Sequence, residues 1–380
     1  MKSILKRYYL PVLFLAFIFF SLTDKMLNIT KDIENSENKK ATEKPEFDIN
    51  HLDNFPSKYE DFFNSNFTLR NYFIKHFNQA VITYLGKSPL PDKVIFGKND
   101  WLFYGEKHLD FYRGIERFTE DELLDMKKEL FYRYEYLKKR GIKYYFIILP
   151  TKYTIYPEYL NNDIIRLYNN TLTDQLIDAL GKNLPFTLID TRKALIDAKK
   201  HNIRLFQKTD SHWNFAGGYF AYHYISQFLK KDFPEIKTME INEYKIDSIL
   251  QKGGDVAKML GNEDKYKEIM IKLTPLHSSV IEGKKTGYDP KGFSIPEDYE
   301  AVWINPKYKK PKGLIIRDSF TGYIIPYLYE DFAKSVYIFD RWEYGLNEEI
   351  IEKEKPDIFI NIVLECHMKN ILQHLSYNKK

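Results

Sequence analysis

Short apolar runs that alternate with helical segments constrain the fold of this chain more than any other feature of its sequence. Five of the runs have the length of one buried strand: IKYYFIILP (142–150), FTLID (186–190), GLIIRD (313–318), SVYIFD (335–340) and DIFINIVL (357–364). Strands that are apolar on both sides need cover on both faces, which the intervening helices can supply. The alternation therefore predicts an α/β fold with a mostly parallel central sheet between two helical layers.

Helical patterns lie between and before these runs. They cover residues 121–141, with Gly141 as a stop, and residues 173–182 and 214–231. An earlier amphipathic helix is predicted from apolar residues spaced three or four apart: Leu69, Phe73, Phe77, Ala80 and Tyr84. Two short apolar segments around Asn99-Asp100 predict a hairpin. Residues from about 235 to 312 are less regular, and we expect insertions over the sheet there.

The N-terminus has the pattern of a membrane segment. Lys2, Lys6 and Arg7 precede an uncharged run from Tyr8 to Leu22. Basic residues before the run place the N-terminus in the cytoplasm and the remainder outside it. We therefore predict an uncleaved signal anchor or transmembrane helix over residues 1–23, with a cleaved signal peptide as the alternative. Residues 24–50 are polar and are predicted to be a flexible linker, and residues 51–380 form the remaining domain. The expected location is the cell membrane, with that domain periplasmic or extracellular.

Charge and cysteine content exclude two classes of protein. The 57 Lys and Arg residues against 53 Asp and Glu give a net charge of +4, and no long basic block stands out. A nucleic-acid partner is therefore not expected, since phosphate binding needs a concentrated positive surface. The single cysteine, Cys366, excludes an internal disulfide. It ends an apolar run beside His367, and we interpret it as a core residue.

A candidate nucleophile follows one predicted strand. Functional residues of open α/β sheets collect at the carboxyl ends of the strands, and Ser319 comes directly after the strand GLIIRD. A serine hydroxyl needs a base to take its proton, usually a histidine that a carboxylate orients. Asp210 and His212, in KTDSHWNFAGGYF (208–220), supply that chemistry. They precede Ser319 by more than one hundred positions, so only the fold can bring the three together.

The same stretch has a simpler interpretation. Asp210, Ser211 or Asn214 can cap a helix that starts near Phe215, and a serine after a strand is often part of a turn. Local sequence alone therefore favours a cap over a catalytic site.

A metal site is the other chemical alternative. Asp210, His212, His223 and Asp255 carry suitable ligand atoms. His212 and His223 are eleven residues apart and do not form the i, i+4 pair of a helical zinc motif. We therefore predict neither metal nor cofactor. The remaining histidines in unrelated contexts are interpreted as surface or packing residues: His51, His76, His108, His201 and His277.

Six blocks in order resemble the AlgJ/AlgX-related polysaccharide O-acetyltransferases. They begin with FPSKYEDFFNSNFTLR (55–70), SPLPDKVIFGKNDWLFY (88–104) and IILPTKYTIYPEYL (147–160), and continue with TDSHWNFAGGYFAY (209–222), GGDVAKMLG (253–261) and IIRDSFTGY (315–323). The resemblance implies an SGNH-hydrolase-like three-layer fold in permuted order. It implies Ser319 as acyl-accepting nucleophile, His212 as base and then acid, and Asp210 as its orienting carboxylate. Arg317 stands where SGNH proteins often have glycine, and Asp255 matches a family block whose role is a turn, packing or catalysis.

The implied reaction is acetyl transfer, through an acetyl-serine, to hydroxyls of an extracytoplasmic polysaccharide. Because acetyl-CoA is cytoplasmic, the resemblance also implies a membrane-bound O-acyltransferase partner that supplies acetyl groups. Two alternatives stay open. A carbohydrate acetylesterase would use the same Ser-His-Asp residues with water as acceptor, and a non-catalytic protein would bind glycan or an assembly partner.

Overall fold

The computed structural model describes residues 8–12, 14, 15, 19, 23, 27, 42–47, 53–66, 68–288 and 299–378. Much of the predicted signal anchor over residues 1–23 and of the predicted linker over residues 24–50 lies outside these residues. No helix within the described ranges combines the length and apolar character needed to cross a membrane.

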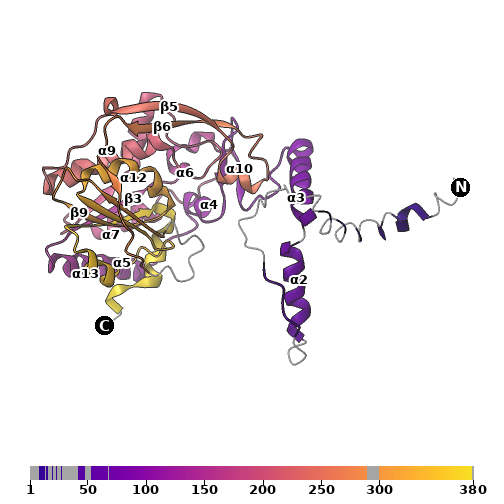
Figure 1. Cartoon of the computed structure of the whole chain (residues 1–380), viewed down its shortest axis with the longest axis horizontal. Helices are drawn as coiled ribbons and strands as arrows, with labels where there is room; N and C mark the ends of the chain where they lie inside the picture. Colours follow the sequence, from indigo (N-terminus) through magenta and orange to yellow (C-terminus); the bar gives the residue numbers. More distant parts are fainter. Residues whose placement is uncertain are drawn as a thin grey trace.

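A seven-stranded sheet forms the centre of the molecule (Figure 1). Its strand order is β4-β3-β11-β9-β10-β8-β7. The first five run parallel to one another, and β8 and β7 add an antiparallel edge. The strands are β3 (Lys143–Leu149), β4 (Thr187–Asp190), β7 (Ile281–Glu282), β8 (Glu300–Ile304), β9 (Lys312–Arg317), β10 (Lys334–Phe339) and β11 (Ile358–Leu364). The predicted mostly parallel sheet is confirmed.

Helices cover both faces of the sheet. In Figure 1, α9 and α12 lie on one side, and α5 and α13 on the other. The helices of the α/β body are α4 (Glu106–Arg113), α5 (Glu120–Lys138), α6 (Lys152–Ile155), α7 (Leu172–Leu180), α8 (Arg192–Ala198), α9 (Phe215–Asp232), α10 (Asp255–Met259), α12 (Ile325–Leu328) and α13 (Glu348–Glu354). The predicted stop after α5 is confirmed, because Gly141 has a φ of 70°, which glycine adopts without strain.

Short helical segments connect these elements. The π-helix is η2 (Val81–Leu85), and the 3-10 segments are η3 (Pro157–Tyr159), η4 (Lys199–His201), η5 (Ile241–Glu243), η6 (Ser319–Tyr323), η7 (Tyr329–Asp331), η8 (Glu365–His374) and η9 (Ser376–Asn378). Two of them, η6 and η8, directly follow the adjacent strands β9 and β11.

Two hairpins lie outside the main sheet. β1 (Val94–Phe96) and β2 (Leu102–Tyr104) form the predicted hairpin around Asn99 and Asp100. Both of these residues have positive φ, and Asn and Asp tolerate that conformation well. β5 (Tyr244–Gln251) and β6 (Glu268–Pro275) form the second hairpin within the irregular region. The same region also supplies β7 and β8 to the main sheet, so it does more than cover that sheet.

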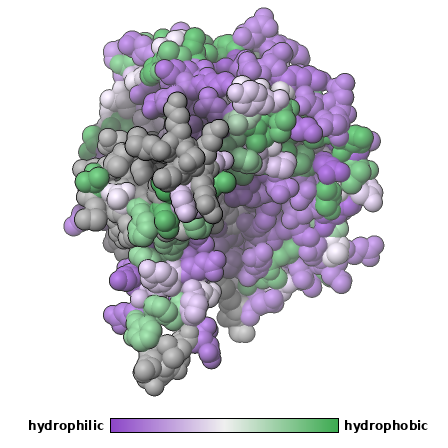
Figure 2. Space-filling view, turned by 90° about the vertical axis from the view of Figure 1, so that its right-hand side faces the viewer, coloured by the Kyte–Doolittle hydropathy of each residue, from purple (hydrophilic) through white to green (hydrophobic). Residues whose placement is uncertain are grey.

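The N-terminal helices α2 (Phe55–Asn66) and α3 (Thr68–Ala80) stand apart from the α/β body (Figure 1). No residue of α2 is buried. α3 is tied to the body by Asn78, whose side chain donates to the Leu260 carbonyl at 3.3 Å. On the face that Figure 2 shows, hydrophilic residues predominate, and hydrophobic residues form separate groups.

A buried ion pair joins the core to the C-terminal segment. Arg133 and Glu129, both fully buried on α5, are bonded at 2.7 Å. The guanidinium also donates to Asn361 on β11, and Glu129 accepts the Ser376 N–H at 2.7 Å. These hydrogen bonds to both charged groups offset much of the cost of burying them, although one guanidinium nitrogen of Arg133 has no partner among the described residues.

The strand order creates a crevice at the carboxyl ends of β9 and β11. The chain leaves β9 for β10 on one side and then returns to β11 on the other. Such a switch point separates the two connecting loops and leaves space between them. Ser319 follows β9 at this position, and Glu365, Cys366 and His367 follow β11.

Candidate active site

Ser319 is the first residue of η6, at the end of a buried strand. Residues 313–317 of β9 are buried, and Asp318 then caps the segment by accepting the Phe320 N–H at 2.9 Å. The other Asp318 oxygen accepts the Tyr344 hydroxyl at 2.8 Å and the Leu364 N–H at 3.1 Å. These three hydrogen bonds to Asp318 fix the turn that follows β9, while Ser319 itself stays partly exposed.

The segment that carries Asp210 and His212 is anchored on both sides. Phe206 and Trp213 pair across it in an isolated β-bridge. The Trp213 indole N–H donates to the Phe320 carbonyl at 2.8 Å, which ties this loop directly to η6. Asn214 accepts the Gly217 N–H at 3.0 Å and caps α9. The loop therefore begins a helix at Phe215, as predicted, and Asn214 supplies the cap.

The structure brings Asp210, His212 and Ser319 into one hydrogen-bonded row. His212 Nε2 lies 2.8 Å from Ser319 Oγ, and His212 Nδ1 lies 2.7 Å from Asp210 Oδ1. Asp210 Oδ1 also accepts the His212 N–H at 2.9 Å. With Nδ1–H donated to the carboxylate, Nε2 presents its lone pair to the serine hydroxyl. This arrangement can remove a proton from Ser319.

Asp255 is a second carboxylate at the same imidazole. Asp255 Oδ2 lies 3.6 Å from His212 Nδ1, and Oδ1 accepts the Ser211 N–H at 2.6 Å. The Asp255 N–H in turn donates to Asp210 Oδ2 at 3.0 Å. Gly254 makes this approach possible, since a Cβ there would lie 2.3 Å from the Asp210 side chain. The block GGDV was the sequence signal for this residue, although sequence alone left its role open.

The two carboxylates set the charge state of the site. Burial alone would lower the pKa of His212, but the charge and hydrogen bond of Asp210, followed by Asp255 and Asp318, raise it to about 9. Burial opposes ionisation of Asp210, but His212 and two backbone N–H groups hold its pKa well below the usual range. Burial and then Asp210 raise the pKa of Asp255. The Asp210–His212 pair is therefore strongly polarised.

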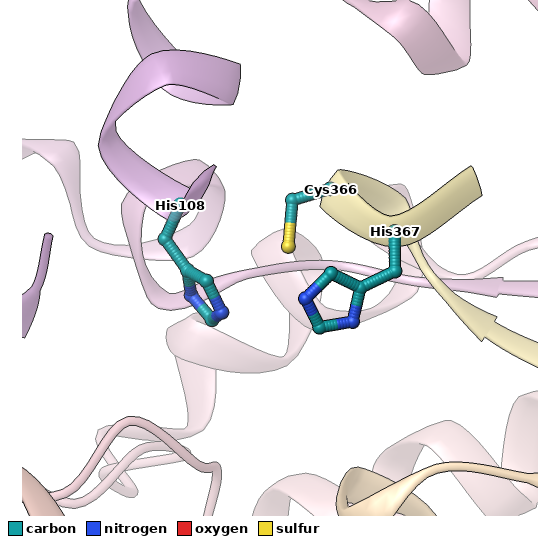
Figure 3. Close-up of side chains that lie close together, drawn as sticks. All are labelled: His108, Cys366 and His367. Atoms are coloured by element: carbon teal, nitrogen blue, oxygen red, sulfur yellow. The ribbon is translucent and has the colours of Figure 1, made fainter. Parts of the chain in front are cut away.

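A cavity of about 390 Å³ opens beside this row. His212 and Ser319 line it, together with Tyr104, His108, Trp342 and His367. His108 is buried, with an exposed fraction of 6%, so of the two roles considered from the sequence, surface or packing, it has the packing one. α4 packs against η8, which places His108 opposite His367 (Figure 3). No local sequence signal connects these two histidines.

The other residues singled out from the sequence lie elsewhere or have other contacts. His223 lies 3.5 Å from Glu240, and in the described residues only Asp210, His212 and Asp255 of the proposed metal ligands lie together. Arg317 points its guanidinium over the Phe339 ring, 5.0 Å from the centroid.

The loop that carries Trp342 has an unusual backbone. Arg341, Trp342 and Tyr344 all have φ between 51° and 63°, which costs L-residues free energy. Asp340 stabilises the loop by accepting the N–H groups of Tyr344 and Gly345 at 3.0 and 2.7 Å. Because strained backbone concentrates at functional sites, this loop is a candidate part of the site.

The sequence matches the family model described as SGNH hydrolase-like domain, acetyltransferase AlgX, over residues 94–288. That range is just over half of the chain, and it contains Asp210, His212 and Asp255. No curated protein sequence matches significantly.

Two solved structures with a TM-score above 0.5 agree on the fold. The structure of Bacillus cereus PatB1 matches with a TM-score of 0.53 and 17% identity, covering 72% of this chain and 96% of that one. The same protein with a sulfonyl adduct matches with a TM-score of 0.51 and 16% identity, covering 70% and 92%. The O-acetyltransferase domain of Pseudomonas putida AlgJ has a TM-score of 0.46 and 15% identity, covering 73% and 92%.

Proposed function

The chain belongs to the AlgX family of SGNH hydrolase-like acetyltransferase domains, as its sequence resemblance had predicted, and we propose that it transfers acetyl groups to polysaccharide hydroxyls. The observation that carries this proposal is the row from Asp210 through His212 to Ser319, with separations of 2.7 and 2.8 Å. The same residues that resemble the family's catalytic residues are the ones that meet at the switch point of the sheet.

The first half-reaction loads the enzyme. Ser319 Oγ attacks the carbonyl carbon of an acetyl donor while His212 Nε2 accepts the hydroxyl proton. The resulting oxyanion lies near the backbone N–H of Ser319, because the first N–H groups of a helical segment have no partner within it. His212 then gives its proton to the departing group, the bond between that group and the carbonyl carbon breaks, and acetyl-Ser319 remains.

The second half-reaction reverses the roles. A sugar hydroxyl loses its proton to His212 Nε2 and attacks the acetyl carbon. The bond to Ser319 Oγ breaks, and His212 returns the proton to the serine. Asp210 keeps Nδ1 protonated and stabilises the imidazolium in both steps, so it stays ionised throughout.

Trp342 is the residue we assign to the acceptor. Its side chain is 37% exposed and lines the same cavity as Ser319, so it adds a flat aromatic surface to a mostly apolar opening. Such a surface suits the apolar face of a sugar ring, whose hydroxyls would then point outward. Asp340 holds the loop that carries this ring by accepting the N–H groups of Tyr344 and Gly345.

The donor and location follow from the N-terminal sequence. A basic flank before an uncharged run would anchor the chain in the membrane with the catalytic domain outside the cytoplasm. Acetyl-CoA is not available there, so a membrane-bound O-acyltransferase would have to deliver the acetyl group. The reaction itself uses groups of the chain and needs no cofactor.

The decisive experiment combines transfer with detection of the intermediate. The purified full chain is incubated with p-nitrophenyl acetate and an oligosaccharide, and acetyl-oligosaccharide, free acetate and acetylated peptides are measured by mass spectrometry. We expect an acetyl group on Ser319 and acetylated oligosaccharide. Ser319→Ala and His212→Ala should each abolish both, whereas Ser248→Ala, which changes an exposed residue of β5, should leave them intact.

Two outcomes separate the alternatives. Unchanged activity in both Ser319→Ala and His212→Ala would refute the catalytic assignment and favour a glycan-binding or assembly protein. Acetyl-Ser319 that forms but passes only to water, at every acceptor concentration tested, would identify an acetylesterase and overturn the transferase proposal.

A further inference from the structure

A second cluster of chemically reactive side chains lies at the cavity, outside the proposed catalytic row. His108 of α4 and Cys366 and His367 of η8 point toward one another (Figure 3). One ligand atom from each residue, a ring nitrogen or the sulfur, lies within 4.8 Å of the other two. The three side chains come from segments more than 250 positions apart, so only the packing of α4 against η8 creates the cluster.

The side chains have few protein partners of their own. Cys366 is a free thiol and is 1% exposed. His367 Nδ1 is buried and has no hydrogen-bond partner among the described residues. A buried polar atom without a partner costs free energy, so its presence in the cluster requires an explanation.

The electrostatic surroundings keep the histidines neutral. Burial, and then His367, His212 and Lys152, hold the pKa of His108 well below its usual value. Burial and Lys107 lower the pKa of His367 to about 4. Neutral imidazoles have the free lone pairs that metal ions require.

The surroundings of Cys366, in contrast, oppose deprotonation of its thiol. Burial, and then the carboxylates of Glu365, Asp318 and Glu116, raise the pKa of Cys366 well above its usual value. These carboxylates oppose a bare thiolate, but they would stabilise a bound cation whose charge exceeds that of the thiolate. Ion binding and thiol deprotonation would therefore occur together.

We infer that His108, Cys366 and His367 form a binding site for one zinc ion. Two neutral imidazoles and one thiolate are a ligand set that suits zinc. Tetrahedral zinc holds nitrogen at about 2.0–2.1 Å and sulfur at about 2.3 Å, so its ligand atoms lie about 3.3–3.6 Å apart. The present separations of at most 4.8 Å close to that range with small side-chain rotations.

The fourth coordination position faces the cavity. His108 and His367 line the cavity, whereas the Cys366 sulfur lies behind them in the core. An ion would therefore enter from the cavity and keep one position open to water or to an oxygen of a cavity ligand. This site departs from the sequence-based expectation of no metal, and it rests on the cluster alone, independently of acetyl transfer.

The neighbouring cluster of Asp210, His212 and Asp255 is a weaker metal site. Its carboxylates already accept hydrogen bonds from the backbone N–H groups of His212, Asp255 and Ser211. His212 Nδ1 is committed to Asp210 at 2.7 Å. A metal there would have to displace these bonds.

Cobalt is the probe that tests the sulfur ligand directly. The full chain is stripped with a chelator and titrated with Co²⁺, and absorption is followed through the near-ultraviolet and visible range. We expect one equivalent per chain, a thiolate-to-cobalt charge-transfer band and the ligand-field bands of tetrahedral cobalt. Zn²⁺ should then displace Co²⁺ and remove all of these bands, because it binds such sites more tightly.

Variants locate the site. Cys366→Ala should remove the charge-transfer band, and each of Cys366→Ala, His108→Ala and His367→Ala should weaken binding about 100-fold or more. His223→Ala, outside the cluster, should have no effect. Circular dichroism and cooperative melting of each variant establish that it is folded, and a variant that is not is replaced by a substitution closer in shape at the same position: Cys366→Ser, His108→Gln or His367→Gln.

Absence of stoichiometric Co²⁺ binding by the wild-type chain would overturn the inference. So would binding that survives in Cys366→Ala but is lost in Asp255→Asn, since that result would place the ion at the Asp210 cluster. Because none of these readouts depends on turnover, an inactive enzyme with an intact zinc site would refute only the proposed function.

Discussion

Asp255 gives the sharpest test of how the site tunes its base. Its carboxylate oxygen lies 3.6 Å from His212 Nδ1, close enough to favour the charged imidazolium. Asp255→Asn removes the charge but keeps an oxygen that can accept the Ser211 N–H. Because a negative charge raises the pKa of a nearby histidine, its removal must lower the pKa of His212 from about 9.

The size of the change follows from the distance. Two unit charges at this separation interact by about 1.2 kcal/mol in bulk water and about 4.6 kcal/mol at an effective dielectric constant of about 20. One pKa unit corresponds to about 1.4 kcal/mol, so the pKa of His212 should fall by about 1–3 units. At pH 7 a base with a pKa of about 9 is about 1% neutral, and a fall of one unit makes it about 10% neutral.

The assay is the pH dependence of kcat/KM for p-nitrophenyl acetate, together with NMR titration of His212. In the wild type, kcat/KM should rise with pH and level off above an apparent pKa of about 9, because the neutral imidazole is the active form. In Asp255→Asn the apparent pKa of this profile should fall by about one unit or more, and turnover at pH 7 should increase several-fold. Asp197→Asn, which removes an exposed carboxylate paired with lysines, is the matched control and should leave the profile in place.

A profile that stays fixed or moves to higher pH in a folded Asp255→Asn variant would refute this reasoning. An NMR titration of His212 that is unchanged would do the same without reference to catalysis.

Three further predictions concern packing, acceptor binding and stability. Gly254→Ala should reduce kcat/KM about tenfold or more, because its methyl would meet Asp210 at 2.3 Å; Gly322→Ala, whose methyl meets nothing within 4 Å, should not reduce p-nitrophenyl acetate turnover. Trp342→Ala should raise the KM for an oligosaccharide acceptor about tenfold and leave acetyl release to water nearly unchanged, as measured by comparing the two products. Glu129→Ala leaves a fully buried guanidinium without its carboxylate and should lower the free energy of unfolding by about 3–5 kcal/mol in denaturant titrations. Unaltered values in folded variants would contradict each of these.

The central sheet shows which strands the local sequence pattern predicted and which it did not. The five apolar runs became β3, β4, β9, β10 and β11, because a strand buried on both faces needs apolar side chains on both. The edge was different: β8 joined the sheet antiparallel to β10 from the region expected to hold insertions. β8 is buried only in part and the two residues of β7 are exposed, so neither forms the continuous apolar run that marks a central parallel strand.

The candidate site, like the sheet, was predicted only in part from the sequence. Asp210, His212 and Ser319 were identified from the sequence, with the family resemblance joining two segments that lie 107 residues apart. Asp255 was noticed without a definite role, and His108 was interpreted as a surface or packing residue with no link to the site. Their positions depend on Gly254 permitting close approach and on α4 packing against η8, which are contacts between distant segments.

The sequence by itself determined the five central strands, the main helices between them, the family and the three residues of the proposed catalytic row. These features follow from hydrophobic periodicity and short motifs, which are properties of neighbouring residues. Only the tertiary structure decided the 2.8 Å contact between His212 and Ser319, the second carboxylate at Asp255 and the cluster of His108, Cys366 and His367. They depend on the order of β9 and β11 in the sheet, on the close approach at Gly254 and on the packing of α4 against η8, which no local pattern specifies.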